Sequence, residues 1–304
     1  MQPVDGWRVL RAMGRMARAV LVFVAVATVG TPAAVADTGP GPRVDTVGAA
    51  EQAAALAYWT PERMRAVGSE PTEPAERLAK PWGKPAPKGV GRFFFTEEPG
   101  GDSWCTATAV PSGNRDTVVT AAHCVHPGFT RDDTEIKAKN IVFVPGYDRG
   151  EEPEGVFAAR AFVAPPNYNL MPWDVAMVVL ATRNGKHVGD VAGTQKIAFG
   201  TRPTGQATMF GYAGSKLAQG EFLMRCTVKA TLFNNTAGDG WNSPCDMAGG
   251  SSGGPWLADF DGRTGTIFSV VSRGGLDEDL HTTSLEGPAL GDPAKQAYQQ
   301  ASAM

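Results

Sequence analysis

The sequence has no strong excess of charge of either sign, and it contains few cysteines and histidines. Its 304 residues carry 28 Lys and Arg against 31 Asp and Glu, a formal net charge of −3. Without a basic surplus or a long basic run, the sequence does not indicate binding to nucleic acid or to an anionic membrane. The four Cys and four His show no C-x-x-C motif and no paired-His spacing. We therefore expect no metal site and no cofactor.

Long hydrophobic runs are also missing, with one exception near the N-terminus. Four arginines between Arg8 and Arg18 precede an apolar run over residues 19–29, and Ala34-Val35-Ala36 follows. This order predicts a secretory signal peptide over residues 1–36, cleaved after Ala36. The run is shorter than the ~20 residues of a comfortable membrane span. We expect a secreted protein with no stable membrane association after cleavage; an uncleaved anchor is the alternative.

Residues 37–88 lack the alternating apolar pattern of strands. The stretch 49–59 can form a short helix that stops before Pro61, and five prolines between residues 71 and 87 predict an extended linker. We interpret residues 37–88 as a largely irregular propeptide or linker that is removed on maturation. A spacer that is never removed is the alternative.

From Gly89 onwards, short apolar stretches alternate with turns rich in Gly, Pro, Asn and Asp, which is typical of an all-β barrel or sandwich. A helix is predicted only at the end, over residues 294–303, with Asp292 as its cap and Pro293 in its first position. The predicted strands form two sets of about six: 92–96, 104–110, 117–120, 141–144, 155–163 and 175–180, then 207–212, 222–230, 255–257, 266–272 and 281–285.

Three short motifs carry candidate chemistry. His123 stands in Thr-Ala-Ala-His-Cys, Asp174 opens an apolar stretch, and Ser252 lies in Gly-Gly-Ser-Ser-Gly-Gly-Pro. A serine hydroxyl needs a neighbouring base to become a nucleophile, and that base needs a third group to orient it. The order His, Asp, Ser is that of one known triad type and differs from the Ser, Asp, His order of an α/β-hydrolase esterase.

On these motifs the chain resembles the trypsin-like (chymotrypsin-fold) serine proteases. The resemblance implies two six-stranded antiparallel β-barrels with a short C-terminal helix in a protease domain over residues 89–304, with barrels at about 89–190 and 195–290. It implies Ser252 as nucleophile, His123 as base and Asp174 as the residue that orients His123. The backbone N–H groups of Gly250 and Ser252 would form the oxyanion hole.

Ser251 departs from trypsin and chymotrypsin, which carry an aspartate there to pair with the new N-terminal amine. The stretch Asp-Met-Ala-Gly-Gly-Ser-Ser-Gly from Asp246 instead resembles the bacterial secreted glutamyl-endopeptidase-like branch, so activation by N-terminal insertion is not expected. Four cysteines allow three pairings. We favour Cys105–Cys124 and Cys226–Cys245, each within one half of the domain; the first resembles the family's bridge beside the catalytic histidine.

The specificity pocket is less well defined. Asp246 lies six residues before Ser252, where trypsin has the aspartate that selects Lys and Arg, but a structural aspartate is an equal interpretation. The resemblance places Ser272, Arg273 and Gly274 on the strand that lines the pocket. The histidine with which glutamyl endopeptidases meet an acidic side chain is missing, and Arg273 could replace it. The sequence leaves the preference at the P1 position (the substrate residue before the cleaved bond) open.

Together these features predict a monomeric, secreted serine endopeptidase that acts on proteins or peptides. The alternatives are an inactive trypsin-like binding module and, less well supported, an esterase.

Overall fold

The computed structural model describes residues 40–304 apart from residues 72, 84, 98–100, 130, 131, 133, 169, 170, 236 and 237. The predicted signal peptide, with its cleavage site, lies outside the described residues. Within the described part of the chain, no helix is both long and apolar enough to cross a membrane.

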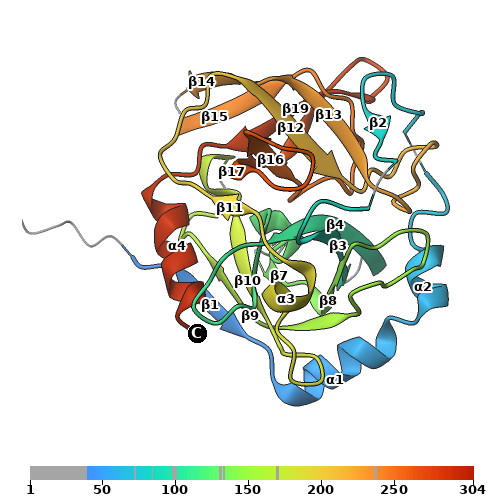
Figure 1. Cartoon of the computed structure of the whole chain (residues 1–304), viewed down its shortest axis with the longest axis vertical. Coiled ribbons are helices and arrows are strands. Elements are labelled where there is room, and N and C mark those ends of the chain that lie inside the picture. The colour runs from blue at the N-terminus through green and yellow to red at the C-terminus, as the bar shows by residue number, and fades with distance from the viewer. Residues whose placement is uncertain are drawn as a thin grey trace, which may run out of the picture. The chain divides into compact units, whose positions relative to one another are not determined.

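The first half of the domain is a closed ring of six antiparallel strands (Figure 1). The order is β9-β10-β5-β4-β3-β8, and pairing between β8 and β9 closes the ring. Its interior is apolar, with Val118, Phe143 and Phe157 almost fully buried. The strands are β3 (Val90–Glu97), β4 (Gly101–Ala109), β5 (Thr117–Thr120), β8 (Lys139–Pro145), β9 (Phe157–Ala164) and β10 (Ala176–Leu180), and a separate hairpin joins β6 (Gly128–Phe129) to β7 (Glu135–Ile136).

The second half is built from two sheets around Trp241, Trp256 and Phe268, whose rings meet edge to face. One sheet contains, in order, β11 (Lys196–Ile197), β17 (Thr266–Val270), β16 (Pro255–Ala258), β12 (Gln206–Gly211), β13 (Met224–Lys229) and β2 (Lys80–Pro81). The other contains β14 (Thr231–Asn235), β15 (Gly238–Ser243), β19 (Thr282–Pro288) and β18 (Arg273–Leu276). The all-β prediction is confirmed, and the strand expected at residues 272–274 is present as β18. By contrast, β14 and β15 were not predicted, because their Gly, Asn and Asp residues resemble turns.

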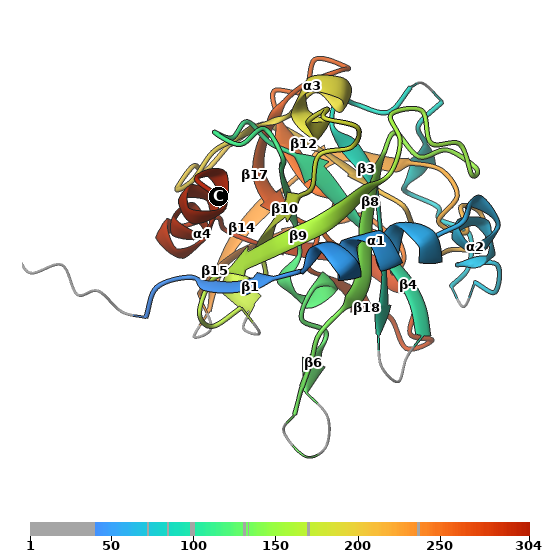
Figure 2. The same ribbon diagram turned by 90° about the horizontal axis from the view of Figure 1, so that it is seen from below.

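Helices are few, as expected. Among the described residues after residue 88, the α-helices are α3 (Val188–Ala192) and α4 (Asp292–Ser302). The helix α4 lies against β9 and β10 (Figure 2). Ala294, Ala297 and Ala301 form its buried side. The predicted C-terminal helix is therefore confirmed, although Gly291 and not Asp292 occupies the capping position.

The described residues of the 40–88 segment pack against both halves of the domain, and the helix predicted over residues 49–59 is present as α1 (Ala49–Tyr58). The strand β1 (Arg43–Thr46) pairs with β9, and α1 lies against β8 and β9. After α2 (Pro61–Ala66), β2 pairs with β13. Figure 1 shows this segment running along the lower edge of the molecule and up its right side. Isolated apolar residues anchor it, and these produce no periodic pattern in the sequence.

Arg92 on β3 shows how closely the segment is integrated. Its side chain is completely buried, and its guanidinium donates to the carbonyl oxygens of Met64 and Val67 at the end of α2. Glu221 accepts a third hydrogen bond at 2.8 Å. A buried charge without partners is costly. The N-terminal segment therefore supplies acceptors to the Arg92 guanidinium, which the rest of the domain would leave partly unpaired.

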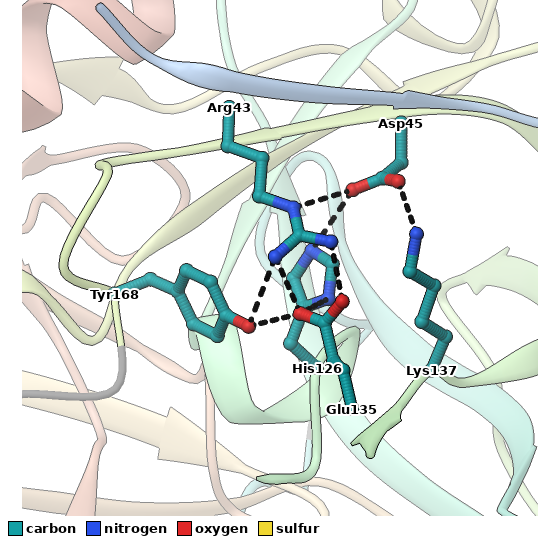
Figure 3. Close-up of polar contacts among 6 residues, drawn as sticks. All are labelled: Arg43, Asp45, His126, Glu135, Lys137 and Tyr168. Atoms are coloured by element: carbon teal, nitrogen blue, oxygen red, sulfur yellow. Dashed lines mark hydrogen bonds and ion pairs between the residues drawn. The ribbon is translucent and has the colours of Figure 1, made fainter. Parts of the chain in front are cut away.

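β1 carries two charged residues into what we call the β1 cluster, formed by Arg43, Asp45, His126, Glu135, Lys137 and Tyr168 (Figure 3). Arg43 pairs with both Asp45 and Glu135, and Lys137 pairs with Asp45. The buried ring of His126 lies 3.3 Å from Glu135 and 3.5 Å from Asp45. Burial lowers the pKa of His126 to about 4 despite these carboxylates. The ring is therefore neutral at physiological pH.

Candidate active site

His123 lies in a 3-10 turn, Ala122–Cys124, that follows β5 directly. Its neighbour Cys124 forms a disulfide with Cys105 on β4, which links the turn to the barrel wall. The second disulfide joins Cys226 to Cys245 in the other half of the domain. Both pairs are those expected from the sequence.

Asp174 connects the two halves of the domain. It stands just before β10, and its Oδ2 lies 2.8 Å from Nδ1 of His123. Its Oδ1 accepts the backbone N–H of His123 at 2.9 Å, which fixes the turn as well as the ring. From the second half, the hydroxyl of Ser272 donates to Oδ2 at 2.6 Å. The structure thus brings His123 and Asp174 together and adds Ser272 to the pair.

The electrostatics of this pair suit proton transfer. Burial tends to lower the pKa of His123, but the charge and hydrogen bond of Asp174, together with Glu97, outweigh it and raise the pKa. Burial acts in the opposite direction on Asp174, and the attraction of His123 and the hydrogen bonds from His123 and Ser272 outweigh it to lower the pKa of the carboxyl. The imidazole is therefore a stronger base than an isolated histidine, beside a carboxylate that stays ionised.

Residues 249–254 around Ser252, which we call the serine turn, pack directly against the residues that precede His123. A Cβ added to Gly253 would lie 2.1 Å from Oγ1 of Thr120 and 2.9 Å from the backbone nitrogen of Ala121, so only glycine fits there. The carbonyl of Ser252 accepts the backbone N–H of Thr106 at 2.7 Å. Ser252 is thereby held at the junction of the two halves, on the side of His123.

The two adjacent serines differ in their surroundings. Ser251 is only 2% exposed, and its hydroxyl donates to the carbonyl of Ala248 at 2.8 Å. Ser252 is less buried. The buried hydrogen bond of Ser251 favours Ser252 as the reactive hydroxyl.

The peptide groups around Ser252 leave two N–H groups available. The carbonyl of Gly249 accepts from Gly214 at 2.7 Å, and that of Ser251 accepts from Gly254 at 2.9 Å. In a trans peptide the N–H points opposite to the carbonyl, so the N–H groups of Gly250 and Ser252 point away from those contacts. Among the described residues, no backbone carbonyl accepts from either group. An oxyanion hole needs donors that are free in this way.

The predicted pocket residues have other partners in this structure. Both oxygens of Asp246 accept backbone N–H groups of the N-terminal segment, from Arg77 and Leu78 on one oxygen and from Ala79 on the other, at 2.6–2.9 Å. Arg273 forms an exposed ion pair with Glu286 at 2.7 Å. Gly274 lies on β18 opposite Leu285. Both charged side chains already have protein partners. For Asp246, a structural role fits these contacts better than a role in substrate specificity.

A cavity of about 560 Å³ lies beside Gly249 and Gly250 of the serine turn. Gly249, Gly250 and Trp104 line one side of it, and Val67 and Glu73 of the N-terminal segment line another. The segment therefore borders the site without filling it, and the side chain of His123 is 40% exposed.

One group in the described part of the chain has the spacing of metal ligands, namely Cys105, His123 and Cys124. Its two sulfur atoms form a disulfide and offer no thiolate, so the group is unsuited to binding a metal.

The comparisons with known proteins agree with this geometry. The family model of the trypsin-like peptidase domain matches residues 105–264, just over half of the chain. The chain belongs to the trypsin-like peptidase family. As a member of this family it is a peptidase, and its substrates are proteins. A search of curated proteins finds no match.

Solved structures of other trypsin-like peptidases are similar over most of the chain. The protease Anisep from Arthrobacter nicotinovorans is 31% identical, with a TM-score of 0.65, and the match covers 75% of this chain and 100% of that one. The thermostable serine protease AL20 from an extremophilic microorganism is 34% identical, with a TM-score of 0.63, covering 71% and 98%. A Glu endopeptidase shares the fold at 19% identity, with a TM-score of 0.58, covering 77% and 100%.

Two residues near the site were not found from the sequence. Glu97 ends β3 and raises the pKa of His123, and Glu73 binds backbone N–H groups on both sides of the serine turn. Neither stands in a recognisable motif, and only the fold brings them to the site.

Proposed function

We propose that the protein is a secreted serine endopeptidase that works through an acyl-enzyme. Ser252 attacks the substrate carbonyl while His123 accepts its proton and later returns it to the leaving amine. Asp174 holds His123 in the required tautomer, and the N–H groups of Gly250 and Ser252 stabilise the oxyanion. The observation that carries the proposal is the Asp174 carboxylate, which binds His123 in one half of the domain and Ser272 in the other.

The proposed P1 preference is not a basic residue. Three backbone N–H groups already bind the Asp246 carboxylate, which leaves at most one of its roughly four acceptor positions for a substrate cation. Arg273, the candidate partner of an acidic P1 side chain, is paired with Glu286. Pocket shape is then the main determinant of selectivity.

A fluorophosphonate probe tests the reaction, because it labels only an activated serine. The secreted protein and its Ser252→Ala variant are incubated with the probe and with a quenched peptide library, and labelling is read by intact mass. We expect labelling and cleavage by the wild type and neither by the variant, with equal circular dichroism spectra.

Two other outcomes would contradict the proposal. Labelling that persists in Ser252→Ala would move the nucleophile elsewhere, with Ser251→Ala as the next variant to test. A folded wild type that neither reacts nor cleaves would favour the inactive binding module.

A further inference from the structure

Glu73 joins two segments that flank the proposed nucleophile. Its Oε1 accepts the backbone N–H of Gly249 at 3.1 Å, three residues before Ser252. Its Oε2 accepts the backbone N–H of Thr282 at 2.9 Å, at the start of β19. β19 pairs with β18, which follows directly on Ser272. One carboxylate therefore links the serine turn to the hairpin beside it.

The bond to Gly249 bears on the oxyanion turn. Glu73 holds the N–H of Gly249, while Gly214 donates to the carbonyl of the same residue at 2.7 Å. With both of its polar groups bound, Gly249 has little freedom to rotate, although it is a glycine. The next N–H in the chain belongs to Gly250, one of the two proposed oxyanion donors, and it shares a peptide plane with the bound carbonyl of Gly249. The orientation of that donor depends on the grip on Gly249.

Glu73 is the first residue of a stretch, residues 73–79, that we call the pocket segment and that the second half of the domain holds in place. The carbonyl of Glu73 accepts the backbone N–H of Lys216 at 2.9 Å, and Glu76 accepts the hydroxyl of the buried Ser215 at 2.6 Å. In return, Asp246, six residues before Ser252, accepts the backbone N–H groups of residues 77–79. Each side contributes a carboxylate to the backbone of the other, so the two segments hold each other in one conformation.

We propose that Glu73 is a positioning residue of the peptidase and that the pocket segment stays with the working enzyme. The proposal rests on the proposed function at Ser252. Glu73 fixes the distance between the serine turn and the β18–β19 hairpin, the two segments that the family resemblance places around the side chain of the P1 residue. Any N-terminal processing then falls before Glu73, and not near Gly89 as the composition of residues 37–88 suggests.

The matched variants are Glu73→Gln, Glu73→Ala and Glu70→Gln. A glutamine is isosteric with glutamate, but only one of its two terminal atoms can accept a hydrogen bond. Glu70 is an exposed carboxylate that lines the same cavity but makes none of the backbone hydrogen bonds of Glu73, so it controls for the lost charge at that place. Two peptide substrates are used that differ only at P1, one with a large side chain and one with alanine.

We expect Glu73→Gln and Glu73→Ala to lower kcat/KM for the large P1 substrate about 10- to 100-fold, because small displacements of positioning groups have effects of this size. The loss for the alanine substrate should be smaller, since it uses less of the pocket. Glu70→Gln should match the wild type. A merely structural role would reduce the titrated fraction of active enzyme and leave the ratio between the two substrates unchanged, which would overturn the proposal.

The N-terminus of the active secreted enzyme, read by intact mass, provides a second test. An N-terminus at or before residue 73 is expected, whereas a fully active enzyme that begins after residue 73 would overturn the proposal. The wild type separates the two levels of inference. If it neither labels nor cleaves, the proposed function fails; if it is active and Glu73→Gln keeps the wild-type substrate ratio, only the role of Glu73 fails.

Discussion

Two of the places that anchor the N-terminal segment differ in their chemistry. In the β1 cluster, the charged side chains of Arg43 and Asp45 meet other charged side chains. In the pocket segment, the carboxylates of Glu73 and Asp246 meet backbone N–H groups. Ion pairs hold side chains together, whereas bonds to the backbone fix the conformation of a loop. Damage to the β1 cluster should therefore affect stability, and damage to the pocket segment should affect catalysis.

Asp174→Asn sets the upper limit for this comparison, since Asp174 is the contact that the two halves share at the site. An amide can present its NH2 group to His123 and favour the wrong tautomer, as documented for this type of triad. We expect kcat/KM to fall by about 10³–10⁴-fold with little change in the melting temperature. A loss below tenfold would contradict the role of Asp174.

His126→Gln tests the β1 cluster through the pH dependence of stability. The pKa of His126 is about 4 in the folded protein, below the ordinary value of about 6.5. As the pH falls from 6.5 to 4, the unfolded chain binds this proton and the folded chain does not, so the free energy of unfolding decreases. The expected loss is about 2–3 kcal/mol. Arg43 and Lys137 oppose protonation, while Asp45 and Glu135 favour it.

The measurement is urea denaturation of the wild type and His126→Gln at pH 7 and at pH 4.5. The variant should be less sensitive to acidification, and kcat/KM at pH 7 should change little. His281→Gln, at a half-exposed position, serves as the control. Its free energy of unfolding should change with pH by the same slope as that of the wild type. Equal slopes for all three proteins would show that His126 does not carry the effect.

Asp246→Asn separates the structural role of this residue from substrate recognition. The amide keeps one acceptor oxygen for the backbone of the pocket segment and loses the other, so a loss of about tenfold in kcat/KM is expected. The loss should be similar for substrates with Lys or with a neutral residue at P1. A drop confined to Lys and Arg substrates would instead identify Asp246 as the specificity residue.

Glu97→Gln should have the smallest effect. Glu97 raises the pKa of His123 by charge attraction, and its removal should lower that pKa. Because His123 must be neutral to act as a base, the acidic limb of the kcat/KM profile should move to lower pH, with activity at pH 8 unchanged. The profile is compared with that of Glu70→Gln, and a shift in the opposite direction would contradict the assignment.

Prediction from the sequence succeeded where local pattern carries the information. The strand over residues 117–120 has the predicted bounds, and every other predicted strand overlaps an observed one. It failed at β14 and β15, whose Gly- and Asn-containing sequences form strands only because they pair with each other and with β19. Within residues 43–66 it found the helix α1, predicted over residues 49–59, but it missed β1 and α2.

The sequence by itself determined the all-β class, the C-terminal helix and the candidate residues His123, Asp174 and Ser252, because each depends on a short pattern that needs no distant partner. Only the tertiary structure decided what surrounds them. The hydroxyl of Ser272 reaches Asp174 across 98 positions of sequence, and Glu73 reaches Gly249 across 176. No local pattern encodes such contacts, because they arise only when the barrels pack together and the N-terminal segment closes over them.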